Sequence, residues 1–108
     1  MTKTAVPYIE DIEKERDAKK YVLRLFITGA TPNSVRALTN IKTICDEHLT
    51  GNYRLEIIDV YQQQEMALKE QLIALPLLIK KLPPPERKLI GDLSDTEKVL
   101  KILGLAQP

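Results

Sequence analysis

Three consecutive prolines, Pro83, Pro84 and Pro85, separate two short apolar runs in the second half of this 108-residue chain. Each proline fixes its own φ angle, lacks an amide donor, and disfavours a helical conformation in the residue before it. A helix across this point is therefore excluded. The runs on either side, residues 75–82 and 88–91, are predicted to be short antiparallel strands joined by an extended turn.

The first half of the chain alternates between strand and helix patterns. Residues 21–27 are apolar on both faces apart from Arg24, which predicts a central strand. Thr31 and Pro32 are typical of an N-cap and a first helical position. Apolar residues then recur at spacings of three and four and predict one buried helical stripe, which comprises Val35, Leu38, Ile41, Ile44, Cys45 and Leu49. Gly51 and Asn52 are the predicted stop.

The second half of the chain is predicted to contain one further strand and two further helices before and after the closing strand pair. Residues 53–60 are predicted to form a strand, and residues 62–72 a helix with Met66 and Leu72 among its inward residues. Residues 94–97 match a capping box that opens a last helix. The strand should place Tyr53, Leu55 and Ile57 on one face, and the last helix should bury Val99, Leu100, Ile102 and Leu103.

The predicted order is β-α-β-α-β-β-α in a single α/β domain over residues 20–108, preceded by a charged arm over residues 1–19. The first crossover should be parallel and right-handed. This order is the plan of a thioredoxin-like domain, and Leu75-Pro76 stands where that plan usually has a cis-proline.

Redox chemistry is missing from the place where such a domain carries it. A thioredoxin uses Cys-x-x-Cys at the start of its first helix, where the helix N-terminus lowers the thiol pKa. This chain has Thr31-Pro32-Asn33-Ser34 there. Its one cysteine, Cys45, is expected to be a buried structural residue.

No other catalytic set emerges from the sequence. The one histidine, His48, is expected near a helix C-terminus in a surface or capping role, and Asp59 is expected to be a cap or surface residue. No spacing singles out a carboxylate pair, a metal-ligand set or a phosphate-binding loop. We therefore expect no enzyme activity and no cofactor.

Bulk properties narrow the class of partner. Sixteen basic and fifteen acidic residues give a net charge of +1, which argues against a general electrostatic grip on nucleic acid. A single cysteine excludes an intramolecular disulfide and favours a cytoplasmic location. No apolar run approaches the roughly 20 residues of a membrane span.

Two segments, residues 31–38 and 82–94, resemble the KaiB family, and the resemblance covers about residues 20–103. It implies a non-enzymatic regulatory protein that binds a KaiC-like hexameric ATPase and modulates its phosphorylation and ATPase cycle, in a circadian clock or in a stress or timing output. The alternative is a redox-inert thioredoxin-like adaptor domain in two-component signalling. A small glutathione-handling enzyme or peroxidase is disfavoured by the missing cysteine.

The second half also contains conflicting local signals. Leu68, Leu72, Leu75 and Ile79 keep helical spacing across Pro76, whereas residues 72–78 fit a buried strand equally well. An ordinary strand is one interpretation, and two packings of similar free energy are the other. KaiB members are known for a resting fold that assembles into tetramers and for a rarer thioredoxin-like monomer that binds KaiC.

The resemblance also assigns residues to oligomerisation and to this change of packing. Tyr21 corresponds to a tyrosine that supports the resting oligomer, here expected to be a dimer or tetramer. Gly91 and Asp92 belong to the family signature and are expected to set the turn into the last helix. Isomerisation at Pro76 or at residues 83–85 is expected to slow the change of packing.

Basic residues gather around the prolines. They are either a solvated hairpin tip or a patch that steers the domain to an acidic partner surface. The residues expected to bind the partner are Arg36, Lys80, Arg87 and Lys88. Glu56 replaces a lysine that is familiar in the family, which argues against recruitment of KaiA. The resemblance leaves KaiA or a sensor kinase as an indirect partner. The lack of a long acidic C-terminal tail argues against a resting tetramer.

Overall fold

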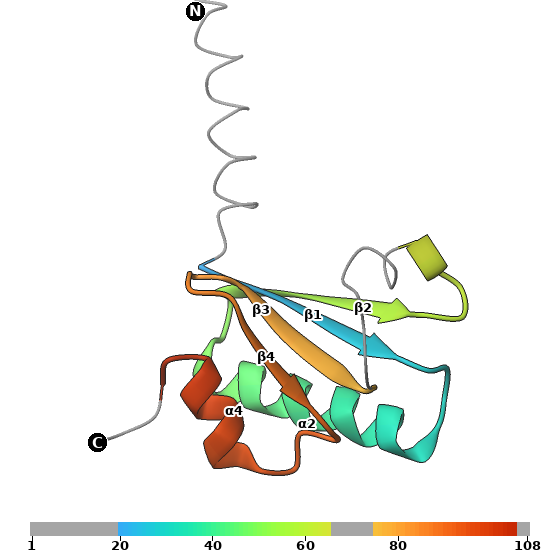
Figure 1. Cartoon of the computed structure of the whole chain (residues 1–108). Helices are drawn as coiled ribbons and strands as arrows, with labels where there is room; N and C mark the ends of the chain where they lie inside the picture. Colours follow the sequence, from blue (N-terminus) through green and yellow to red (C-terminus); the bar gives the residue numbers. More distant parts are fainter. Residues whose placement is uncertain (1–19, 66–74, 106–108) are drawn as a thin grey trace, which may run out of the picture.

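The computed structural model describes residues 20–65 and 75–105, which form a mixed four-stranded sheet with the order β2-β1-β3-β4 (Figure 1). The central strand β1 pairs in parallel with β2 and antiparallel with β3, and β3 pairs antiparallel with β4. The strands are β1 (Tyr21–Ile27), β2 (Tyr53–Asp59), β3 (Leu77–Leu82) and β4 (Arg87–Ile90). The predicted central strand, parallel crossover and antiparallel closing pair are confirmed.

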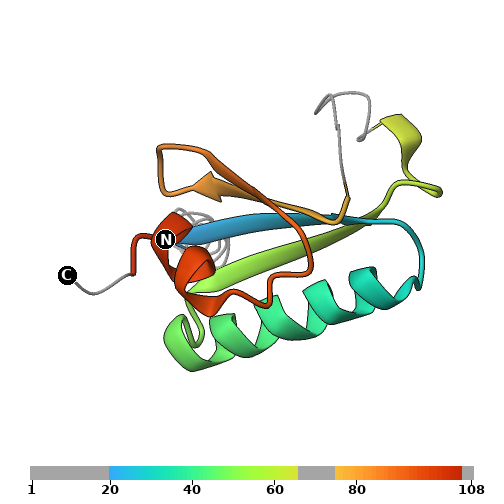
Figure 2. The same ribbon diagram turned by 60° about the horizontal axis from the view of Figure 1, so that its bottom comes forward.

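Two helices, α2 (Pro32–His48) and α4 (Thr96–Ile102), lie on the same side of the sheet (Figure 2). Between them and the sheet lies the larger apolar cluster, to which Tyr53, Leu55 and Ile57 of β2 contribute one face as predicted. The fully buried centre of this cluster consists of Leu23, Leu25, Ala37, Ile41, Cys45, Leu78 and Val99. A second cluster of Phe26, Ile58, Leu77 and Ile79 lies on the opposite face of the sheet.

The start of α2 follows the prediction, but its buried face is rotated. The Thr31 hydroxyl accepts a hydrogen bond from the Ser34 amide at 3.3 Å, and Pro32 opens the helix. Val35, predicted to be buried, is 50% exposed, whereas Ser34 and Ala37 are fully buried. Ser34 and Ala37 continue the spacing of Ile41 better than Val35 does, and hydrogen bonds satisfy the Ser34 hydroxyl.

Several element boundaries differ from the prediction: β2 ends at Asp59 instead of residue 60, and α2 ends at His48, before the predicted stop. Strand β3 begins at Leu77 because Pro76, preceded by a cis peptide bond, offers no amide to the ladder. Strand β4 covers residues 87–90 instead of 88–91. Helix α4 is capped by Asp95, whose carboxylate accepts the Lys98 amide at 3.3 Å, instead of by Ser94. The Ser94 amide already donates to the Asp92 carboxylate at 3.0 Å, which places the cap one residue later.

Parts of the sequence prediction fall outside the described residues. The helix predicted over residues 62–72 is described only as far as residue 65. Its predicted inward residues, Met66 and Leu72, lie outside the described residues, as does Leu68 of the alternative helical spacing. The arm over residues 1–19 lies outside as well. In the last helix, Val99 and Leu103 are buried, and Leu100 and Ile102 are partly buried, as expected. No helix among the described residues has the length and apolar character needed to cross a membrane.

Candidate functional site

The start of α2 lies beside Leu75 and Pro76, where a redox-active thioredoxin would hold its thiols. A hollow of about 470 Å³ separates the two segments, lined by Thr28, Thr31, Pro32, Asn33, Leu75 and Pro76. The Ser34 hydroxyl accepts the Thr28 amide at 3.1 Å and bonds the Thr31 hydroxyl at 2.8 Å. The polar groups at this position therefore stabilise the helix start, and none of them can perform thiol–disulfide exchange.

Cys45 lies at the start of the last turn of α2 and is fully buried, as predicted. Burial raises the pKa of its thiol to about 12, and the negative charge of Asp46 adds to the effect. A thiol must ionise to act as a nucleophile or a metal ligand. Among the described residues, moreover, no group of three or more histidine, cysteine or acidic side chains could hold a metal ion.

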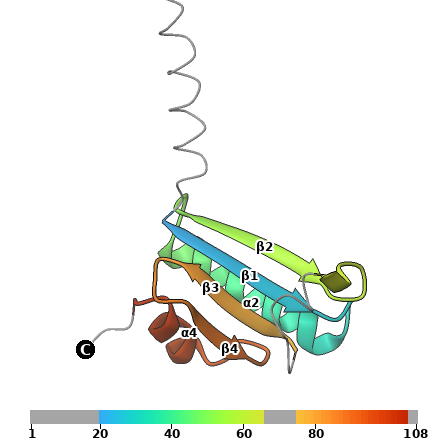
Figure 3. The same ribbon diagram turned by 45° about the horizontal axis from the view of Figure 1, so that its top comes forward.

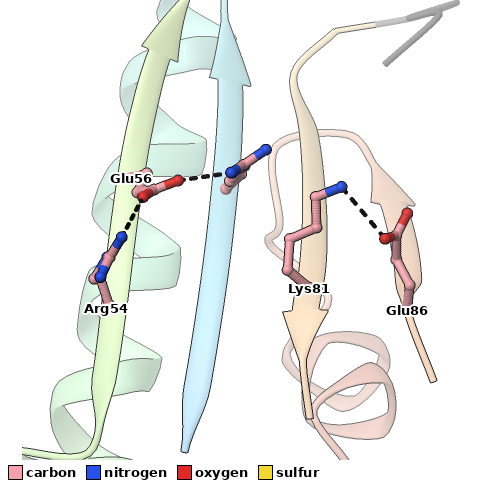
Figure 4. A network of polar contacts seen from close by, with 5 residues as sticks. Arg54, Glu56, Lys81 and Glu86 are labelled. Carbon is pink, nitrogen blue, oxygen red and sulfur yellow. Dashed lines mark hydrogen bonds and ion pairs between the residues drawn. The ribbon is translucent and has the colours of Figure 1, made fainter. Parts of the chain in front are cut away.

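The sheet face opposite the helices carries a network of charges. Glu56 on β2 accepts hydrogen bonds from Arg24 at 2.7 Å and from Arg54 at 3.2 Å (Figure 4). Burial alone would raise the pKa of Glu56, but the hydrogen bonds from the two arginines outweigh it and hold the pKa below its usual value. Next to this group, Lys81 pairs with Glu86 at 3.3 Å across the proline turn. Glu56 is thus occupied by contacts within the sheet.

The predicted basic residues fall into two groups. Arg87 and Lys88 are exposed on β4, and Lys80 lies directly opposite Arg87 in the ladder between β3 and β4. Lys80, however, is only 4% exposed, which contradicts its expected place on an open patch. Burial lowers the pKa of Lys80, and the charge of Arg87 lowers it further.

Arg36 belongs to a different surface, on α2. Its side chain is 55% exposed and donates to the Asp92 carboxylate at 3.4 Å and to Asn33. One helical turn further along, the Asn40 amide donates to the Asp92 carbonyl oxygen at 2.8 Å. Two side chains of α2 therefore hold the turn that enters α4. Sequence reasoning missed Asn40; its spacing of four residues from Arg36 shows only that the two share a helix face.

The turn itself contains the signature residues Gly91 and Asp92. Gly91 has a φ of 123°, a region that favours glycine, and Leu93 follows at 63°. Hydrogen bonds from the side chain and amide of Ser94 hold the pKa of Asp92 below its usual value, and Arg36 contributes. The expected role of these residues in the turn into the last helix agrees with this geometry.

The residues assigned to oligomerisation and to the change of packing lie in several environments. Tyr21 is 6% exposed at the start of β1, where its amide donates to the Asn52 carbonyl at 3.2 Å. Pro76 is buried, Pro83 is half-buried, and the two following prolines are exposed. Their roles in assembly remain predictions.

The fold and this site define a thioredoxin-like domain in which the described residues provide no redox-active thiol. The N-terminal domain of Synechococcus elongatus SasA superposes with a TM-score of 0.65 at 23% identity, covering 83% of this chain and 89% of that one. Chloroplastic thioredoxin z superposes with a TM-score of 0.69 at 15% identity, covering 88% and 86%. These similarities confirm the thioredoxin-like fold.

The sequence comparisons identify the family. The KaiB domain model matches residues 24–105, and the circadian clock oscillator protein KaiB of Gloeothece citriformis is 54% identical over 87 residues, covering 81% of this chain and 82% of its relative. The chain belongs to the KaiB family. This assignment confirms the resemblance and the expectation of a clock-family regulator instead of an enzyme.

Proposed function

We propose that this protein binds a KaiC-like hexameric ATPase and modulates its phosphorylation and ATPase cycle, in a circadian clock or in a simpler stress or timing output. The KaiB-family match over residues 24–105 carries this proposal. The absence of thiol chemistry at Thr31–Ser34 supports it, because the thioredoxin-like surface is then available for binding instead of electron transfer. We place the protein in the cytoplasm, and any link to KaiA or a sensor kinase is indirect, through the ATPase.

The cations proposed to contact the ATPase are exposed in two places, with Arg36 on α2 and with Arg87 and Lys88 on β4. Arg36 is held by Asp92, so its guanidinium is presented in a fixed position, whereas the two β4 residues have exposed side chains. Lys80 does not belong to this surface, because its side chain is only 4% exposed. Exposed cations suit an acidic partner surface.

The proposed mechanism is a shift of population between two packings of the C-terminal half. The ATPase binds the thioredoxin-like packing, and a second packing forms a homo-oligomer, with Tyr21 in its interface. Repacking of β4 and α4 would break the contacts that Arg36 and Asn40 make with Asp92. If the binding packing were about 1% populated, the apparent affinity would fall about a hundredfold.

A time course of co-elution with the KaiC-like ATPase in the presence of ATP tests the proposal. Complex formation over hours, at a rate independent of ATPase concentration, supports a rare binding-competent packing. Rapid formation supports the partner but shows that the binding packing already dominates. The variant Arg36→Gln/Lys88→Gln should bind more weakly than Lys42→Gln, which alters an exposed cation elsewhere on α2. No complex under any nucleotide condition contradicts the proposal.

A further inference from the structure

Strand β4 lies at one edge of the sheet, and the direction of its backbone hydrogen-bonding groups follows from its pairing with β3. Among the described residues, β3 is the only strand beside it (Figure 3). The Gly91 amide donates to the Pro76 carbonyl on the β3 side at 3.0 Å. Because backbone groups alternate in direction along an antiparallel strand, the N–H and C=O groups of Lys88 and Ile90 point outward, away from β3.

The side chains along this edge are basic and apolar. Ile90 is 56% exposed, and it lies on the same sheet face as Lys88, opposite Leu77 and Ile79 in the ladder. Arg87 points to the other face, on which it stands opposite Lys80. An added strand would therefore meet a cation on each face and one apolar side chain.

The positive charge of this edge is not balanced within the described part of the chain. Neither Arg87 nor Lys88 has an ion-pair partner there, whereas the neighbouring Lys81 is paired with Glu86. The nearly buried Lys80 faces Arg87, and the pKa of Lys80 is lowered by burial and by that charge. A carboxylate brought beside Arg87 would relieve this repulsion.

We infer that the outer edge of β4 binds an extended acidic segment of a partner protein by antiparallel strand addition. In this register the segment reads, from its N-terminus, apolar, any residue, acidic, acidic. Its apolar residue lies opposite Ile90 and its two acidic residues opposite Lys88 and Arg87. The inference does not rest on the proposed function, since it concerns any partner that carries such a segment.

The charges discriminate among the possible occupants of the edge. A second copy of β4 would add two more cations to this edge and no carboxylate, which is unfavourable. Lysine on a short edge strand in general guards against uncontrolled pairing. The same positive charges attract an acidic strand, so binding of such a strand should weaken as salt is added.

An NMR titration of the full-length ¹⁵N-labelled protein tests the inference with the capped peptide Ser-Val-Thr-Glu-Glu-Ser. The amide resonances of Lys88 and Ile90 should shift and their hydrogen exchange should slow. The Leu89 amide, which already points toward β3, should change little. A matched peptide with lysine in place of both glutamates should not bind.

Three variants separate the hydrogen bonds from the charge. Lys88→Pro removes an outward amide without removing a ladder bond, and binding should be lost while Leu89 remains protected. Lys88→Gln keeps the amide and should weaken binding about threefold. Lys42→Gln on α2 should have no effect.

Other outcomes would overturn the inference. These are no response to the peptide, a response centred on β2, equal binding of the lysine peptide, or protection of Lys88 and Ile90 by self-association without any peptide.

Discussion

Cys45 shows how burial determines the chemistry of a single residue. It is the one cysteine of the chain, and its side chain is enclosed by the larger apolar cluster instead of lying at the helix start. Its thiol pKa of about 12 leaves almost no thiolate at neutral pH. The position of a cysteine in the helix, and not its presence in a thioredoxin-like fold, therefore decides whether it can react.

We predict that Cys45 resists alkylation in the folded protein. At pH 8 its reaction with iodoacetamide should be roughly a thousandfold slower than in guanidinium chloride, because unfolding returns the thiol to its ordinary pKa. Mass spectrometry of timed samples measures both rates. Labelling of the native protein at the unfolded rate would show that the thiol is accessible and ionised.

Glu56 has the opposite pKa shift, and its effect on stability depends on pH. Its folded-state pKa is depressed, so its ion pairs contribute stability above the ordinary glutamate pKa and lose it as the pH falls through the folded value. Glu56→Gln should lower the free energy of unfolding by about 1 kcal/mol at pH 7. The difference in unfolding free energy between the wild-type protein and the variant should shrink toward pH 3. Urea unfolding at the two pH values measures it.

Glu47→Gln provides the control, because Glu47 is exposed on α2. Its effect should stay within about 0.5 kcal/mol at both pH values. A Glu56→Gln effect that persists unchanged at pH 3 would show that the ion pairs are not its cause.

At the scale of elements, the first helix depends on its cap more than on its first apolar residue. Thr31→Ala removes the acceptor for the Ser34 amide and should cost about 1 kcal/mol of unfolding free energy. Val35→Ala should cost much less, because Val35 is half-exposed and alanine favours helix. Chemical denaturation compares the two variants. A larger loss of unfolding free energy for Val35→Ala would show that Val35 is buried in the core.

The cap of the last helix provides a second test of the same kind. Asp95→Ala should destabilise the protein by about 1 kcal/mol, since the Asp95 carboxylate caps α4. Ser94→Ala should cost less, because it keeps the amide bond to Asp92 and removes only the side-chain hydrogen bond to that carboxylate. Thermal unfolding of both variants measures the difference. Equal or reversed effects would show that Ser94 caps the helix, as the capping box predicted from the sequence requires.

At the scale of the whole molecule, local patterns predicted the order of the described elements, and contacts across the fold determined their details. The N-cap at Thr31 and the central β1 were predictable from neighbouring residues. Burial of Lys80 was not, because it follows from the pairing of β3 with both β1 and β4. The bond from Asn40 to Asp92 joins residues 52 apart in sequence, and no local spacing connects them.

The same distinction explains which part of the candidate site was predicted. Arg87 and Lys88 were correctly expected on the surface beside the proline turn. The separation of Arg36 onto the surface near Asp92 required the packing of α2 against the turn into α4. The sequence therefore predicts which cations are candidates for partner binding. The fold determines which of these cations lie on the same surface.

The most direct test of the account is the rate of ATP hydrolysis and of phosphorylation by a KaiC-like ATPase, measured with and without saturating amounts of this protein. We expect the wild-type protein to change at least one of these rates. The variant Arg36→Gln/Lys88→Gln should require a higher concentration for the same effect, whereas Lys42→Gln should not. Rates that stay unchanged while the complex is seen to form would contradict a regulatory role.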